Sequence, residues 1–250
     1  MSVSPGGHPR WRNIEHRVGL LIPSSNSLIE PEYYAVMPPS VSVHFARLTM
    51  TEVSADGIAR QDADVIVQSQ MLATANVEVI LFCITAASFY MGLDYDAKLK
   101  RRIEAESGKP ALTAARTVID ALRVLDVRRI ALATPFVPKG TGRGRRFFEA
   151  NGFDVVAAEG LDYTDNFSIA LIDPETVRDL VRRVDTDTAE AIIIPGGNMP
   201  CLSIVEEMEA ELGKPVVTTN QAGIWALLRH LGAVDRVDGT GRLLREHLAG

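Results

Sequence analysis

Five segments of the sequence are rich in small groups that form hydrogen bonds, and each lies after one of the apolar, strand-like runs. These segments are residues 23–27, 83–88, 134–137, 165–166 and 195–201. Hydroxyl, amide and backbone N–H groups donate hydrogen bonds to carboxylates and phosphates, and a thiol adds a nucleophile or a proton donor. The sequence therefore predicts a site for a small anion if the fold brings these segments together.

The strongest anion-binding patterns lie at Asn26 and at the segment 196–198. The turn Pro23-Ser-Ser-Asn26 offers hydroxyls, an amide and N–H groups where a helix is expected to begin, and helix starts favour anions. A plain helix cap explains the same pattern equally well. Gly196-Gly197-Asn198 allows backbone N–H groups to approach an anion because glycine accepts unusual dihedral angles; a structural turn is the alternative.

The chain has two cysteines, Cys83 and Cys201. Cys83 ends an apolar run and is followed by Thr85 and Ser88, so polar neighbours are available to lower its pKa and make it a nucleophile or proton donor. A buried core thiol is the competing interpretation, because free cysteine is among the most buried residue types. Cys201 precedes an expected helix, and the same two interpretations apply to it.

Several other kinds of site lack support in the sequence. The histidines are His8, His16, His44, His230 and His247, and no pair of them has metal-ligand spacing, so no metal is expected. No serine lies in a Gly-x-Ser-x-Gly elbow. The glycine-rich segment 140–144 fits neither phosphate-loop fingerprint, and we interpret it as a mobile basic loop.

Short apolar runs alternate with segments of helical periodicity, a pattern typical of a parallel α/β sheet. The runs are residues 18–22, 41–46, 79–83, 130–134, 154–158, 191–194 and 216–218. Amphipathic stripes follow at Ala115, Val118, Leu122 and Leu125 and again at Ile224, Leu227, Leu228 and Leu231. We expect helices on both faces of the sheet, which makes three αβα layers.

The two halves of the chain resemble each other. Glu106-Ser-Gly-Lys-Pro-Ala-Leu-Thr113 is echoed by Glu211-Leu-Gly-Lys-Pro-Val-Val-Thr218, and each copy leads into one of the amphipathic stripes. This repetition predicts two similar doubly wound lobes whose strand ends meet at one crevice. The expected divisions are a flexible tail (1–16), an N-terminal lobe (17–127), a C-terminal lobe (128–220), and a C-terminal helix and tail (221–250) that packs back on the N-terminal lobe.

Composition narrows the class of protein. The chain has 250 residues, of which 46% are hydrophobic and 23% charged, values that suit a globular protein. The formal net charge of −6 gives no field that would attract nucleic acid or an anionic membrane. Two separated cysteines argue against a disulfide framework and favour a cytoplasmic location, and no apolar run reaches the roughly 20 residues of a membrane span.

Several dispersed motifs follow one another between about residues 17 and 232. They are Pro23-Ser-Ser-Asn26, Thr85-x-x-Ser-Phe-Tyr-x-Gly92, Val127-Arg-Arg-x-Ala-Leu-Ala-Thr134, Asp165-Asn166, Met199-Pro-x-Leu-Ser203 and Gly213-Lys-Pro-Val-Val-Thr218. In this order they resemble the aspartate/glutamate racemase superfamily, in the branch that contains maleate cis-trans isomerase and arylmalonate decarboxylase.

This resemblance implies two lobes related by pseudo-twofold symmetry, no cofactor, a homodimer, and two facing cysteine positions around a small carboxylate. In the isomerase a cysteine thiolate adds to the double bond and allows rotation; in the decarboxylase a cysteine protonates an enediolate held by an oxyanion hole. By position, Asn26 and Asn166 are expected to hold the carboxylate and Thr85 to join the anion hole. Phe136 and the residues Gly196, Gly197 and Asn198 complete the expected substrate-binding set.

The sequence departs from the family pattern at both cysteine positions. Counting from Gly92 places the first at Ile84, one residue after Cys83, and counting back from Gly213 places the second at Gly196. Phe136 stands where the family has a tyrosine, so one hydroxyl donor is missing.

The leading hypothesis is a cofactor-independent isomerase that acts on a small mono- or dicarboxylate, with Cys83 as nucleophile or proton donor. A lyase of the decarboxylase type, using the same anion hole with or without a thiol, is the first alternative. A catalytically inactive carboxylate-binding protein is the second.

Overall fold

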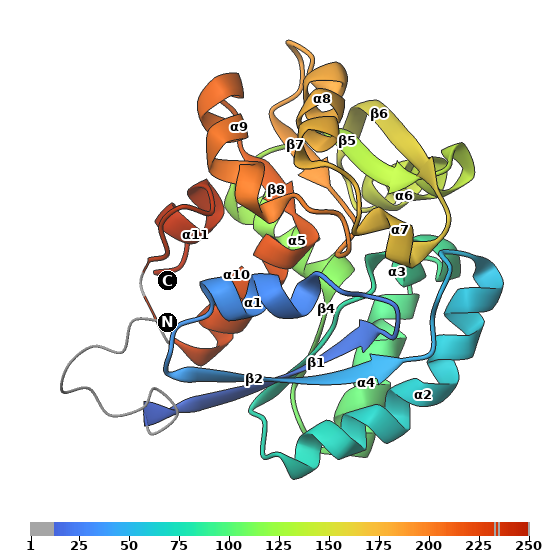
Figure 1. The fold of residues 1–250 in the computed structure, drawn as a ribbon, viewed down its shortest axis with the longest axis vertical. Helices are drawn as coiled ribbons and strands as arrows, with labels where there is room; N and C mark the ends of the chain where they lie inside the picture. Colours follow the sequence, from blue (N-terminus) through green and yellow to red (C-terminus); the bar gives the residue numbers. More distant parts are fainter. Residues whose placement is uncertain (1–12, 233, 235, 250) are drawn as a thin grey trace.

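The computed structural model describes residues 13–232, 234 and 236–249, and it contains two parallel four-stranded sheets stacked one above the other (Figure 1). Most of the tail expected at 1–16 lies outside the described residues, and β1 begins at His16. The first sheet has the strand order β2-β1-β3-β4, with β1 (His16–Pro23), β2 (Val41–Leu48), β3 (Val79–Phe82) and β4 (Ala111–Thr113).

The second sheet repeats this topology. Its order is β6-β5-β7-β8, with β5 (Arg129–Phe136), β6 (Asp154–Tyr163), β7 (Ala191–Ile194) and β8 (Val216–Thr218), so β1 and β5 occupy equivalent places. Apart from the exposed Arg129, the strands β3, β5, β7 and β8 are buried along their whole length. Burial on both faces explains why they consist of near-continuous apolar runs.

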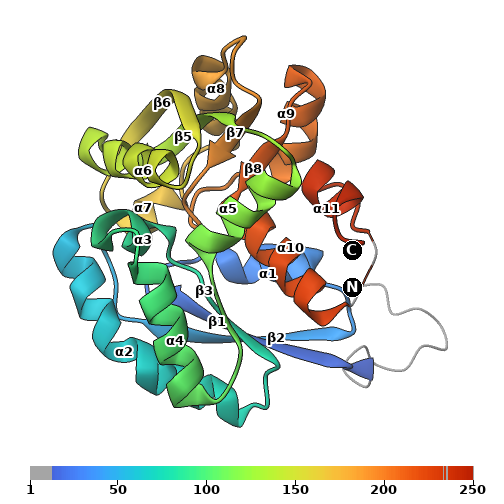
Figure 2. The same cartoon turned by 180° about the vertical axis from the view of Figure 1, so that it is seen from behind.

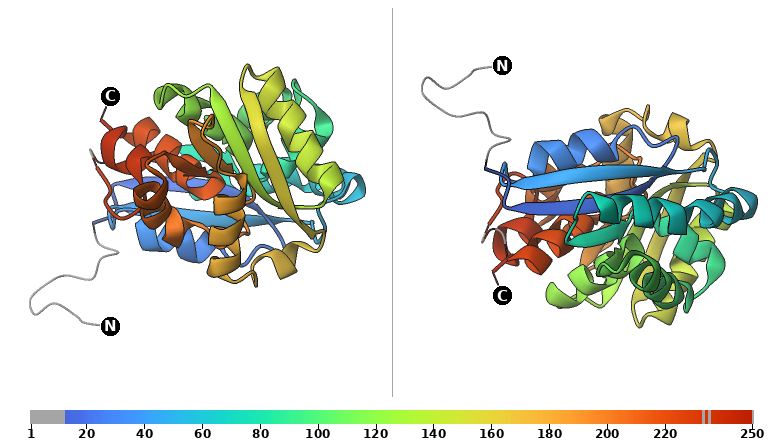
Figure 3. Two further views of the ribbon diagram at one scale, coloured as in Figure 1. Left: turned by 90° about the horizontal axis from the view of Figure 1, so that it is seen from above. Right: turned by 90° about the horizontal axis from the view of Figure 1, so that it is seen from below.

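Helices cover both faces of each sheet. In the N-terminal lobe they are α1 (Ile29–Val36), α2 (Ala55–Thr74), α3 (Thr85–Met91), α4 (Tyr95–Ser107) and α5 (Ala114–Val124). In the C-terminal half they are α6 (Pro138–Ala150), α7 (Asn166–Ile169), α8 (Pro174–Val184), α9 (Val205–Leu212), α10 (Thr219–Leu231) and α11 (Arg242–Glu246), with a 3-10 turn at Leu202–Ile204. The view from below shows α1 and α2 on opposite sides of β1 and β2 (Figure 3). The predicted α/β fold class is confirmed.

Two equivalent helices, α5 and α10, pack against each other at the centre of the molecule (Figure 2). Each follows the fourth strand of its sheet, and α10 also contacts α1 and β3 of the N-terminal lobe. Gly223 permits this approach, because a Cβ there would lie 3.0 Å from Leu81 Cδ2 and overlap the Tyr33 hydroxyl. The segment after α10 returns to the C-terminal lobe, where the backbone N–H groups of Gly241 and Arg242 donate to Glu206 and Glu209 of α9.

Two features differ from the expectations. The apolar runs omitted β4, whose three residues Ala-Leu-Thr are too short to stand out; the repeated Gly-Lys-Pro-x-x-Thr segment was the available signal. The segment 140–144 is not a mobile loop but part of α6. Two of its glycines serve close packing, because a Cβ at Gly140 would lie 2.8 Å from Phe136 Cβ and one at Gly144 would lie 3.2 Å from Phe89.

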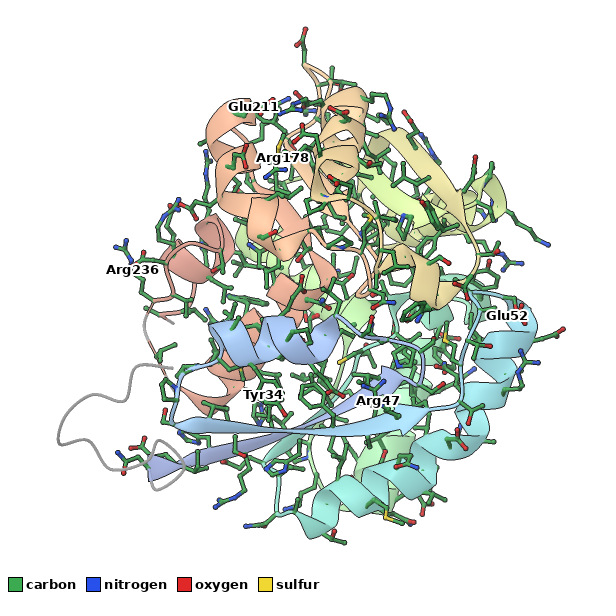
Figure 4. The ribbon with its side chains drawn as sticks, viewed as in Figure 1. Tyr34, Arg47, Glu52, Arg178, Glu211 and Arg236 are labelled. Carbon is green, nitrogen blue, oxygen red and sulfur yellow. The ribbon has the colours of Figure 1, made fainter. Side chains whose placement is uncertain are left out.

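Surface ion pairs join neighbouring helices, as between Arg178 on α8 and Glu207 on α9, and between Arg182 and Glu211 (Figure 4). None of the helices within the described residues is long and apolar enough to span a bilayer. In that same part of the chain, no cluster of three His, Cys, Asp or Glu residues has a geometry suited to a metal ion.

Candidate active site

A small cavity of about 30 Å³ lies between the lobes, at the carboxyl ends of strands from both sheets. It is lined by Pro23, Asn26, Met50, Val53, Cys83, Ile84, Thr85, Ala86, Pro135, Phe136, Asn166, Ile169, Gly196, Gly197 and Asn198. All eight residues expected at the site from the sequence are on this list. The crevice therefore forms where the parallel-sheet rule places ligands, beyond the carboxyl ends of the strands.

Asn26 lies 2% exposed at the turn after β1 and makes contacts in both lobes. Its Oδ1 accepts hydrogen bonds from the backbone N–H groups of Leu28 (3.0 Å) and Ile29 (2.9 Å), which fixes the start of α1. Its Nδ2 donates to the carbonyl of Gly197 in the opposite lobe at 3.2 Å. The cap and the site interpretations are thus compatible, because the amide nitrogen still has a second proton for a ligand.

Arg47, at the end of β2, holds the Asn26 turn in place (Figure 4). Its guanidinium donates to the carbonyl oxygens of Ser24 (2.9 Å) and Asn26 (2.8 Å) and pairs with Glu30 at 2.7 Å. These bonds fix the backbone of the turn while leaving the Asn26 side chain directed at the crevice.

Asn166 and Asn198 join the lobes on the other side of the cavity. Asn166, at the start of α7, donates from Nδ2 to Ser25 Oγ at 2.9 Å. Asn198 donates to the carbonyl of Asn166 at 2.6 Å and accepts from the backbone N–H of Ser27 at 3.1 Å. Each lobe thus supplies amides that are anchored by the other lobe, which positions them rigidly for binding.

Thr85 and the backbone of Gly196 both contact the hydroxyl group of Thr219. Thr85, the first residue of α3, lies 3.1 Å from Thr219 at the start of α10, oxygen to oxygen. The Gly196 N–H donates to the same Thr219 hydroxyl at 3.1 Å. Gly196 has a φ of +141°, a conformation that residues with a Cβ rarely adopt, and a Cβ there would lie 3.0 Å from Pro135 Cγ.

Cys83 lines the cavity but is only 4% exposed. Its Sγ donates to the carbonyl of Leu81, in the strand β3 that ends just before it, at 3.5 Å. Burial raises the pKa of the Cys83 thiol, and the neighbouring Tyr33 hydroxyl offsets only part of this shift, so the thiol is protonated at neutral pH. This state suits a proton donor better than a thiolate nucleophile.

Cys201 does not belong to the residues that line the cavity. It is 2% exposed, and burial again raises the pKa of its thiol. The two cysteines are free thiols and lie within the hydrophobic core. For Cys201 the geometry matches the core-thiol interpretation.

Phe136 closes the cavity at the end of β5. Its ring packs edge-on against Phe89 of α3, with centroids 6.5 Å apart. The ring atom Cζ lies 3.8 Å from the place that a Cβ of residue 196 would take. The position that bears the hydroxyl in tyrosine therefore faces Gly196.

Some residues of the site were missed from the sequence. Met50, Val53 and Ile169 give the cavity apolar walls, and Thr219 and Asn220 support its glycine backbone from α10. The signal for the last two was the polar Thr-Asn-Gln segment that precedes the apolar stripe of α10.

Two lobes of the same parallel-sheet topology, with a small crevice lined by amide side chains between them, define a two-lobed α/β protein. The chain belongs to the arylmalonate decarboxylase family, whose model matches residues 18–244. The maleate isomerase of Nocardia farcinica is 32% identical over 243 residues, covering 93% of this chain and 97% of the relative. The arylmalonate decarboxylase of Bordetella bronchiseptica is 27% identical, covering 92% and 96%.

The structure is also similar to solved structures of maleate isomerases. A Cys-to-Ala variant of the maleate isomerase of Pseudomonas putida S16, crystallised with maleate, has a TM-score of 0.89 and 29% identity, and the match covers 93% of this chain and 98% of that one. A Cys-to-Ser variant of the Nocardia farcinica maleate cis-trans isomerase, with a covalently bound succinylcysteine intermediate, has a TM-score of 0.88 and 30% identity, covering 92% and 98%. The homologues are isomerase or lyase enzymes.

Proposed function

We propose that this chain is a cofactor-independent isomerase of the maleate isomerase type, acting on a small dicarboxylate in the crevice between the lobes. The main observation in favour is that Asn26, Asn166 and the Gly196–Gly197 backbone line one small cavity whose polar groups come from both lobes. Full-length similarity to maleate isomerases supports the same reaction class. A cytoplasmic homodimer is part of this proposal; the free thiols favour the location, and the resemblance favours the dimer.

The amides and backbone N–H groups act on the substrate carboxylates. Asn26 and Asn166 each have an amide proton left for a carboxylate oxygen after their bonds to Gly197 and Ser25. Thr85 supports the Gly196 backbone through Thr219 and stands beside the cavity as a further donor. Donors that are held in place before the ligand arrives stabilise a developing oxyanion without reorganisation.

In the isomerase reaction, Cys83 is the proposed nucleophile. Its sulfur adds to one alkene carbon, the thiol proton goes to the neighbouring carbon, the new C–C single bond rotates, and reversal of both steps releases the trans isomer. The addition requires loss of the thiol proton, which burial opposes by raising the pKa of Cys83.

The protonated state of Cys83 favours a second candidate, a lyase of the decarboxylase type. In that reaction the C–C bond to one carboxylate breaks, CO₂ leaves, and the electron pair remains as an enediolate on the other carboxylate. Cys83 then supplies the proton to carbon, and solvent returns a proton to sulfur. The amide and backbone donors would hold the enediolate oxygens.

Product analysis distinguishes these candidates. Maleate, malonate and methylmalonate are first ranked by ligand-induced shifts of the melting temperature, and those that stabilise the protein are then incubated and followed by proton NMR. We expect stabilisation by maleate and slow formation of its trans isomer. Stabilisation without turnover of any of the acids would favour the binding-protein alternative.

The role of Cys83 is tested with Cys83→Ser, using Cys201→Ser as the matched control because both thiols are buried and free. We expect Cys83→Ser to lower kcat by at least about a hundredfold, the lower end for a lost proton-transfer group, and Cys201→Ser to leave it nearly unchanged. Equal turnover by wild type and Cys83→Ser would exclude the thiol from the reaction.

A further inference from the structure

Glu32 is a partly buried carboxyl group on α1 that does not line the cavity. Its Oε2 accepts a hydrogen bond from Asn220 Nδ2 at 2.5 Å, and its carboxyl group also faces the backbone N–H of Leu202. Among the described residues, Glu32 forms no ion pair with a basic side chain, whereas Glu30 on the same helix pairs with Arg47 at 2.7 Å. A carboxylate that is largely removed from water and has no positively charged partner is costly, so the position of Glu32 calls for a functional explanation.

A short chain of contacts connects Glu32 to the cavity. Asn220 Nδ2, which contacts Glu32, also donates to the carbonyl of Gly197 at 3.1 Å. The same carbonyl accepts from Asn26 Nδ2 at 3.2 Å. Asn220 Oδ1 lies close against Gly197, 2.9 Å from where a Cβ would stand. One amide therefore separates the carboxyl group from the backbone that lines the anion site.

The groups around Glu32 are neutral near pH 7, so no neighbouring charge holds Glu32 in one protonation state. From α1 the titratable neighbour is Tyr33, and from the loop before the 3-10 turn it is Cys201; burial raises the pKa of both, so both are neutral near pH 7. From α10 and the 3-10 turn the neighbours are the neutral Asn220 amide and the Leu202 N–H. Burial raises the pKa of Glu32 from 4.5 to about 7, so both protonation states are present near neutral pH.

We propose that Glu32 is a positioning residue that takes up a proton when an anion binds against the Gly197 backbone. This inference rests on the proposed function in one respect, namely that the crevice binds an anion. A second negative charge close by disfavours ionised Glu32, and reciprocity requires that protonation of Glu32 strengthens anion binding by the same factor.

The experiment measures proton uptake on anion binding by calorimetry at about pH 7.5. Sulfate and oxalate are the probes, because neither titrates in this range and neither is isomerised. Each titration is repeated in two buffers of different ionisation enthalpy, so that the difference in heat counts the protons taken up. Wild type, Glu32→Gln and, as control, Glu149→Gln are compared; Glu149 is an exposed residue of α6 that pairs with Arg145.

We expect wild type and the control to take up a fraction of a proton and to bind about five- to tenfold more tightly as the pH falls from about 8 to about 6. Glu32→Gln should take up none and show nearly constant affinity. If Glu32 had a purely structural role, Glu32→Gln would change the stability of the protein but would still take up protons on anion binding.

The wild-type protein also provides a test that does not need the variant to fold. Infrared difference spectra on adding sulfate should show the carbonyl stretch of a newly protonated carboxyl group. Binding without proton uptake, or uptake that persists in Glu32→Gln, would overturn the role of Glu32 and leave the anion site intact. Failure of wild type to bind either anion between about pH 6 and 8 would instead count against the anion site itself, and this inference would fall with it.

Discussion

Replacing Gly196 by alanine should destabilise the protein because the backbone at this position has a conformation reserved for glycine. Its φ is +141°, and a Cβ would lie 3.0 Å from Cγ and 3.2 Å from Cδ of the Pro135 ring. A residue forced into such a region costs about 1 to 3 kcal/mol, and overpacking against a rigid ring adds a similar amount. We expect a total loss of about 2 to 6 kcal/mol.

The matched control is Gly142→Ala, in the middle of α6. There the nearest atom to a new Cβ is Arg146 Nη1 at 3.8 Å, and the backbone is helical. Alanine should stabilise this position by about 0.4 to 1 kcal/mol, because it restricts the unfolded chain and suits a helix. Comparing two glycine-to-alanine changes with opposite expected signs separates local strain from a general effect of adding a methyl group.

Thermal unfolding is the assay. At about 2 to 4 °C per kcal/mol for a chain of this size, Gly196→Ala should lower the melting temperature by roughly 4 to 24 °C, and Gly142→Ala should raise it by a few degrees. Gly196→Cys, which adds a thiol at the position that the family resemblance assigns to a cysteine, should melt close to Gly196→Ala. A Gly196→Ala protein that melts within a degree of wild type would refute the reasoning.

Two further changes test the neighbours of this loop. Phe136→Tyr places a hydroxyl at the ring position that faces Gly196, so we expect about ten- to hundredfold tighter binding of a carboxylate by calorimetry, the gain from one hydrogen bond to a charge; unchanged or weaker binding than in wild type would contradict the placement. Glu32→Gln tests the pH dependence of stability. Because the folded-state pKa of Glu32 is raised from 4.5 to about 7, the folded protein holds its proton more tightly, and wild-type stability should fall by on the order of 3 kcal/mol as the pH rises through this interval. Thermal unfolding between about pH 5 and 8 should show no such loss of stability in Glu32→Gln. If the stability of both proteins changed with pH in the same way, the raised pKa of Glu32 would be contradicted.

The lobes and most strands were predictable because buried parallel strands leave a simple signal of apolar runs, and the repeated segment marks the duplication. The strand β4 escaped because three residues of ordinary composition carry no periodicity. The segment 140–144 was misjudged for a different reason. Its glycines looked like a loop, but Gly140 and Gly144 allow close contacts with Phe136 and with Phe89, and Phe89 lies on α3, far away in the sequence.

That the eight expected residues line one cavity was predictable, because each lies at or just beyond the carboxyl end of a strand and strand ends converge in this fold. Their roles in binding and catalysis stay predictions. The orientation and the protonation state of each side chain were not predictable. The direction of the Cys83 thiol toward Leu81, and the pKa that burial gives it, depend on packing by α1 that no local pattern encodes. Glu32 was overlooked for a related reason, since its importance comes from Asn220, which is 188 positions away.

The size of the cavity has a consequence for the kinetics of binding. A space of about 30 Å³ holds roughly two water molecules, whereas a dicarboxylate of four carbons has eight non-hydrogen atoms. The cavity must therefore widen before such a ligand fits, and a separation of the lobes would break the hydrogen bonds of Asn26 with Gly197 and of Ser27 with Asn198. The observed association rate should therefore reach a plateau at high ligand concentration, at the rate with which the protein itself opens.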